Sequence, residues 1–80
     1  MNEINRKRVF KVLKDTFLSL DGEISDDWGP NQIQDWDSLG HLNLVMSLGE
    51  EFDVSIDFVE VISIETVGDI YKVLNNKGIE

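Results

Sequence analysis

The residues with the clearest chemical potential lie together in the middle of the chain, where a serine precedes the only histidine by three positions. These residues are Ser38 and His41, and Asp35 and Asp37 come just before them. Residues three apart on a helix are neighbours, so the spacing fits a nucleophile and its base, with an aspartate to orient the base. We do not favour this interpretation. A chain of 80 residues leaves little room for a water-excluding cleft, and acidic surroundings would repel a developing oxyanion.

Ser38 is better suited to being an attachment point. It follows a loop rich in Gly, Pro and Asp and begins an amphipathic helical run. The free N–H groups and the dipole at a helix start stabilise negative charge, which suits a phosphodiester on the serine hydroxyl. The same serine can also cap the helix without being modified, and the local pattern alone leaves both interpretations open.

Charge is distributed unevenly along the chain. Residues 1–14 hold five Lys and Arg against one Glu, whereas residues 15–71 hold fourteen Asp and Glu and no Lys or Arg, within a net charge of −9. The partner of the Ser38 region should therefore be basic. Nucleic acids and anionic membranes are disfavoured as partners, because they need clustered basic residues. The basic start and the end of the chain are expected to lie side by side.

Several other classes of site and location are disfavoured. There is no cysteine, so thiolate zinc sites and disulfides are excluded, and the loop from Asp21 to Asp27 lacks the residue order of a calcium loop. We expect no metal site. No apolar run approaches the roughly 18 residues that span a bilayer, and the basic start does not lead into a signal-peptide core. We therefore expect a cytoplasmic protein without membrane insertion.

The first half of the chain predicts one helix and one long loop. Apolar residues recur at helical spacing from Asn2 to Leu20, and Asp21-Gly22 should end this helix. The loop that follows, from Asp21 to Trp36, has no sustained period. It is expected to be pinned to the helices by its large apolar side chains, Ile24, Trp28, Ile33 and Trp36.

The second half predicts three more helices. One begins at Asp37 or Ser38, and its main apolar face is expected to consist of Leu39, Leu42, Val45, Met46, Gly49 and Phe52. Because Leu44 and Leu48 widen that face, the helix should be either deeply buried or apolar toward a partner. A short helix follows at 58–62, and Thr66 caps a last one that leaves through Lys77-Gly78. The chain is thus predicted to be an all-α, four-helix bundle forming one domain over 1–80.

The chain resembles acyl carrier proteins over essentially its whole length. The resemblance is carried by Asp37-Ser38-Leu39-Gly40-His41-Leu42-Asn43-Leu44-Val45-Met46, by Glu50-Glu51-Phe52 with Ile56, and by Ile64-Glu65-Thr66-Val67-Gly68-Asp69-Ile70. It implies that a phosphopantetheinyl transferase attaches 4′-phosphopantetheine to Ser38 from coenzyme A, with magnesium. The thiol of this arm would hold an acyl group as a thioester, so the chain would be a carrier and not an enzyme.

The resemblance also assigns roles to individual residues. Asp37 flanks the modified serine. Partner enzymes with basic docking patches would contact Leu39, Met46, Glu50, Glu51 and Glu60. An acyl chain would be sheltered by Leu42, Leu48, Ile56, Val61 and Ile64, although ordinary core packing explains these five equally simply.

Departures from the common fatty-acid carrier pattern point to a specialised lipid or secondary-metabolite pathway. Gly40, Asn43 and Gly49 stand where charged side chains are usual, Phe58-Val59 replaces a polar stretch, and Trp36 directly precedes Asp37. Two alternatives to a monomeric acyl carrier remain: a peptidyl or aminoacyl carrier, and an unmodified acidic helical adaptor for a basic partner.

Overall fold

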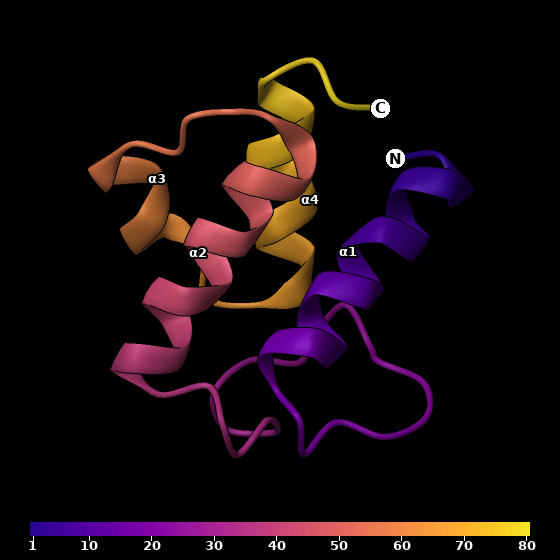
Figure 1. The fold of residues 1–80 in the computed structure, drawn as a ribbon, viewed down its shortest axis with the longest axis vertical. Helices are drawn as coiled ribbons and strands as arrows, with labels where there is room; N and C mark the ends of the chain where they lie inside the picture. Colours follow the sequence, from indigo (N-terminus) through magenta and orange to yellow (C-terminus); the bar gives the residue numbers. More distant parts are fainter.

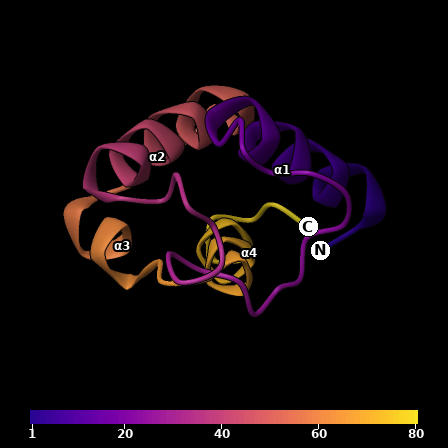
Figure 2. The same ribbon diagram turned by 90° about the horizontal axis from the view of Figure 1, so that it is seen from below.

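The predicted all-α fold is confirmed, with four helices in the expected order and no strand. In the computed structural model, which describes residues 1–80, the helices are α1 (Glu3–Thr16), α2 (Ser38–Phe52), α3 (Phe58–Ser63) and α4 (Val67–Asn76). Figure 1 shows the long first loop passing below the helices, and Figure 2 shows α1 and α2 as an arch over α4, with α3 at its edge beside α2. None of the four helices is long and apolar enough to cross a lipid bilayer.

The first helix is shorter than its apolar pattern predicts. It begins after Asn2, whose side chain accepts a hydrogen bond from the N–H of Asn5 at 2.8 Å, but it ends at Thr16 and not at Leu20. The reason is tertiary. Phe17 leaves the helix to stack on Trp36, with ring centroids 5.4 Å apart. The N–H of Ser19 donates to the carboxylate of Asp35 at 2.9 Å, which replaces a hydrogen bond within the helix.

The core is built from α1, α2, α4 and the long loop. Three of the four residues predicted to pin the loop are buried, namely Ile24, Ile33 and Trp36, and Trp28 is half-buried against the same core. The loop backbone also reaches α4, because the carbonyl of Trp28 accepts from the N–H of Val67 at 2.9 Å. The loop therefore belongs to the packed structure, as its apolar side chains predicted.

The second helix buries only part of the wide apolar surface that its sequence indicated. Its buried residues are Leu44, Val45, Leu48 and Phe52. Leu39, Leu42 and Met46 are exposed instead, by 69%, 54% and 64%. The sequence left open whether this wide apolar surface is buried or presented to a partner, and part of it remains on the surface.

The last two helices agree with expectation. Asp57 caps α3 in a capping box with Glu60, and Thr66 caps α4 in a capping box with Asp69. None of the α3 residues is buried, so this short helix sits on the bundle and adds little to its core. The two chain ends are adjacent, since the N–H of Asn2 donates to the carbonyl of Glu80 (Figure 1).

A glycine in the first turn of α2 makes the loop's close approach to this helix possible. A Cβ on Gly40 would lie 2.3 Å from the carbonyl oxygen of Asp35 and 3.0 Å from the ring of Phe17. We expect Gly40→Ala to lower the free energy of unfolding by about 2 kcal/mol, because the steric cost exceeds the gain in helix propensity. Urea unfolding measures this change. The exposed α2 variant Asn43→Ala should be neutral or slightly stabilising, and an equal loss in both variants would contradict the packing argument.

Candidate functional site

Ser38 is the first residue of α2 and its side chain is exposed. The residue before it supplies the cap: the carboxylate of Asp37 accepts from the N–H of Gly40 at 2.8 Å. The backbone carbonyl of Asp37 accepts from the N–H of His41 at 2.8 Å. Because Asp37 caps the helix, the Ser38 hydroxyl has no capping role and is available for modification at the positive end of the helix dipole.

A cavity open to solvent lies beside Ser38, between the start of α2, the end of the long loop and α3. We call it the Ser38 cavity. It has a volume of about 700 Å³ and combines polar groups near the serine with apolar side chains from both helices. Its lining residues are Pro30, Trp36, Asp37, Ser38, His41, Leu42, Phe58, Val61, Ile62, Ile64 and Glu65.

His41 is held away from any role as a base for Ser38. The indole N–H of Trp36 donates to its Nδ1 at 2.9 Å, and its Nε2 lies 2.8 Å from the carbonyl oxygen of Val61. Both ring nitrogens are therefore engaged, and the indole and imidazole planes stack with 6.1 Å between centroids. The aspartates are engaged elsewhere as well, Asp37 with Gly40 and Asp35 with Ser19. This arrangement cannot operate as a catalytic triad.

The five positions assigned to an acyl shelter separate in space. Leu42, Val61 and Ile64 line the Ser38 cavity. Leu48 is fully buried in the core and does not line it. Ile56 borders a different hollow, at the far end of α2. The cavity thus unites three of the five positions.

The positions assigned to partner contact also differ in their surroundings. Leu39 and Met46 are exposed, and Glu50 is exposed without an ion-pair partner. Glu51 pairs with Arg8 of α1 at 2.8 Å, and Glu60 pairs with Lys77 at 2.7 Å. Glu50 is therefore the one of the three glutamates whose charge is not balanced within the chain.

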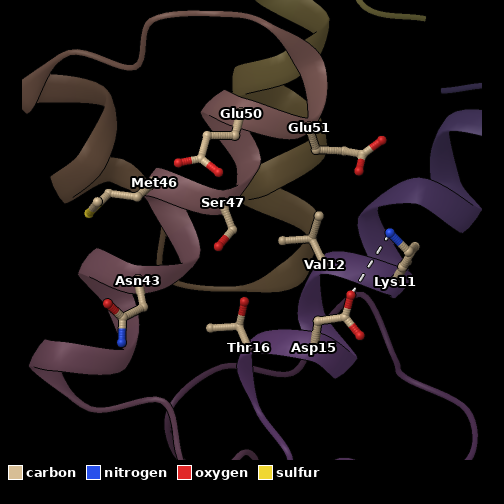
Figure 3. Close-up of a pocket in the computed structure, with 9 residues that line it drawn as sticks. All are labelled: Lys11, Val12, Asp15, Thr16, Asn43, Met46, Ser47, Glu50 and Glu51. Atoms are coloured by element: carbon tan, nitrogen blue, oxygen red, sulfur yellow. Dashed lines mark ion pairs between the residues drawn. The ribbon is translucent and has the colours of Figure 1, made fainter.

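A second cleft, between α1 and α2, is shown in Figure 3. It has a volume of about 540 Å³ and is mostly polar. Three of the predicted partner residues line it from α2, namely Met46, Glu50 and Glu51, and Lys11 and Asp15 line it from α1. In Figure 3, Glu51 extends toward α1, whereas the side chains of Met46 and Glu50 point away from it. The surface around Met46 therefore includes α1, which the sequence did not indicate.

The carboxylate of Asp35 fixes the loop just before the site. The backbone N–H of Ser19 donates to it and is the main cause that lowers the pKa of Asp35 below its ordinary value of 3.8, assisted by the Ser19 side chain. The charged form is therefore favoured, and it holds the loop against the end of α1. This contact helps to fix the positions of Trp36 and Asp37, which follow Asp35 and line the Ser38 cavity.

Glu60 gives α3 a defined response to acid. The side chain of Lys77 and the backbone N–H of Asp57 both donate to its carboxylate, and they lower the pKa of Glu60 below its ordinary value of 4.5, with Lys77 as the larger cause. Because the pKa of Glu60 is lower in the folded than in the unfolded state, its ionised carboxylate stabilises the fold at pH values above 4.5. This stabilisation is lost as the pH falls through the folded-state pKa.

We therefore expect Glu60→Gln to be less stable than the unmodified chain at neutral pH, with the difference closing below pH 4.5. Glutamine keeps the capping interaction, so the variant removes only the charge. Urea unfolding over a pH series measures the difference. Glu23→Gln, at an exposed loop position, serves as control; a Glu60→Gln difference that does not vary with pH would contradict the assignment.

Fold and site together define a small, acidic helical bundle that exposes one serine at the start of its second helix. A curated relative, a probable acyl carrier protein of Caulobacter vibrioides (strain NA1000 / CB15N), is 42% identical over 40 residues. The match spans 50% of this chain and only 46% of the relative's length. No family model matches the chain, and no solved structure matches it. The relative confirms the resemblance to acyl carrier proteins, and it is named as a carrier and not as an enzyme.

Six residues of the Ser38 cavity were not assigned to the site from the sequence. They are Pro30, Trp36, His41, Phe58, Ile62 and Glu65. Two signals were available: Trp36 directly precedes the Asp-Ser-Leu motif, and Phe58 lies in a stretch that is unusually apolar for the family. Their convergence on one cavity depends on the packing of α3 against α2, which no local pattern specifies.

Proposed function

We propose that this chain is an acyl carrier protein that bears 4′-phosphopantetheine on Ser38 and delivers acyl groups to partner enzymes. The observation that carries the proposal is the exposed Ser38 hydroxyl at the start of α2, left free because Asp37 caps the helix. The similarity to a probable acyl carrier protein supports it. The chain contains no cysteine, so the thiol that forms the thioester must come from the arm.

The residues around Ser38 are suited to such an arm. The first N–H groups of α2 point toward a phosphodiester on the serine, and the helix dipole favours its negative charge. The Ser38 cavity adjoins the attachment point and offers both the polar and the apolar contacts that a pantetheine chain needs. Ser38 would hold the arm, and Leu42, Phe58 and Ile62 would contact whatever lies along the cavity.

The test of this proposal is covalent loading of the unmodified chain. Incubation with coenzyme A, magnesium and a phosphopantetheinyl transferase should raise the intact mass by one phosphopantetheine group. Peptide mapping should locate the group on Ser38. A chain that gains no mass with several transferases, while a known carrier is loaded in parallel, would contradict the proposal.

Docking to partners is proposed to use the exposed surface of α2. Leu39 and Met46 supply apolar contact, and Glu50 supplies a charge that no residue of the chain balances. The net charge of −9 should attract enzymes with basic patches over a distance comparable to the Debye length. A specialised lipid or secondary-metabolite pathway is the proposed setting, because the family's charged α2 positions are here Gly40, Asn43 and Gly49.

Charge reversal on α2 should slow association with the transferase. We expect Glu50→Lys to lower the association rate constant about three- to tenfold at low ionic strength, with the difference shrinking as salt is added. Stopped-flow binding measures both effects. Glu3→Lys changes the net charge equally at the far end of α1 and should have a smaller effect. Equal effects of the two reversals, or rates insensitive to salt, would contradict the docking role of α2.

A further inference from the structure

His41 lines the Ser38 cavity, together with Trp36 of the loop and Val61 of α3. The indole nitrogen of Trp36 can only donate, so Nδ1 of His41, 2.9 Å away, must accept. The proton of the neutral ring is then on Nε2, which donates to the carbonyl oxygen of Val61 at 2.8 Å. One neutral imidazole thus connects the loop, α2 and α3 across the seam between the two helices.

This connection is significant because α3 is held by little else. None of its residues is buried, and its other polar contact with a distant part of the chain is the ion pair between Glu60 and Lys77. Trp36, which fixes the imidazole, is only 3% exposed and is itself stacked on Phe17. The donor to His41 is therefore rigid, and the ring has little freedom to turn away from Val61.

The positions beyond His41 are separated from the cavity. Leu48, further along the core side of α2, has no exposed surface and does not border the Ser38 cavity. Ile56 borders another hollow, together with Val45 and Val54 near the end of α2. The Ser38 cavity thus reaches neither Leu48 nor Ile56.

We infer that His41 seals the seam between α2 and α3, so that an acyl group carried by this chain stays in the open Ser38 cavity and does not enter the bundle. The cargo class that such a site selects is short acyl groups, because a long chain would leave much of its apolar length in water. His41 is then a specificity-determining residue. This inference rests on the proposed function for its biological meaning.

The seal is testable without any transferase, because the chain contains no cysteine. Ser38→Cys introduces a single thiol, and alkyl methanethiosulfonates attach a methyl or a dodecyl chain to it: the thiolate forms a disulfide with the alkyl sulfur, and methanesulfinate leaves. Leu48 lies about 15 Å along the helix from the attachment point, within reach of dodecyl but not of methyl. Methyl NMR then compares the two adducts residue by residue.

With His41 intact, we expect the dodecyl chain to shift the methyl resonances of Leu42 and Ile62, which line the cavity, and to leave those of Leu48 and Ile56 unchanged. Dodecyl-dependent shifts at Leu48 would overturn the inference. Because the tether is chemical, this result is obtained whether or not coenzyme A loading succeeds, so failure of the seal and failure of the carrier function are told apart.

The role of His41 itself is tested in the same background. His41→Ala removes both hydrogen bonds, and dodecyl-dependent shifts should then extend to Leu48. His41→Gln, which retains one donor and one acceptor, should behave like the chain with histidine. If the alanine variant does not fold, His41→Ser, which is too short to span to Val61, carries the same expectation. Shifts that remain confined to the cavity in a folded alanine or serine variant would overturn the assignment of the seal to His41.

Discussion

Ser38→Ala should abolish the gain of mass on incubation with coenzyme A, magnesium and a phosphopantetheinyl transferase. The substitution removes the only atom through which the arm can be joined at this site. Its structural cost should be small, within about 0.5 kcal/mol of the free energy of unfolding, because Asp37 and not Ser38 caps α2 and the Ser38 side chain is exposed. Intact-mass spectrometry and urea unfolding measure the two quantities on the same sample.

The matched control is Ser55→Ala, which removes the hydroxyl of another exposed serine. That variant should be loaded like the unmodified chain. Mass gained by a folded Ser38→Ala variant would show that the arm is attached elsewhere. A variant that fails both to load and to fold would show instead that Ser38 has a structural role that the capping geometry does not reveal.

Trp36→Ala should cause the largest loss of stability among the substitutions considered. Trp36 is 3% exposed, stacks on Phe17 and donates its indole N–H to His41. Truncation of such a residue costs about 3–5 kcal/mol. At roughly 0.05–0.15 kcal/mol per residue, a domain of this size has only about 4–12 kcal/mol in total, so we expect a large unfolded fraction. Urea unfolding followed by circular dichroism measures the change.

Trp28→Ala is the control for this prediction. Trp28 is half-buried, and its main tie to α4 is a backbone carbonyl that the substitution leaves in place. The expected loss is about 1–2 kcal/mol. A Trp36→Ala variant no less stable than Trp28→Ala would contradict the view that the Trp36 ring connects α1, the loop and the Ser38 cavity.

Local signals were sufficient for much of the fold. The capping residue of α4 could be predicted because a side-chain acceptor at the cap position satisfies N–H groups only a few residues away. The residues that pin the long loop could be predicted because large apolar side chains in a polar loop are expected to pack into the core. Both arguments need no knowledge of distant residues.

The predicted end of the first helix was wrong, and periodicity left open which face of α2 is buried. Tertiary contacts decided both. The apolar spacing that continues to Leu20 does not extend α1, because Phe17 and Ser19 bind Trp36 and Asp35 of the loop. On α2, apolar residues occur nearly all round the helix, so spacing could not decide which would be covered. The positions of α1 and α4 select Leu44 and Leu48 for the core and leave Leu39 and Met46 outside.

The sequence by itself determined that this chain is helical, acidic and similar to acyl carrier proteins around Ser38, because composition, capping residues and the Asp-Ser-Leu motif are properties of neighbouring residues. Only the tertiary structure decided that Asp37 leaves the Ser38 hydroxyl free, that Glu51 and Glu60 are paired, and that His41 joins Trp36 to Val61. The last two arrangements join groups far apart in the chain, and all three depend on where the backbone places each donor and acceptor.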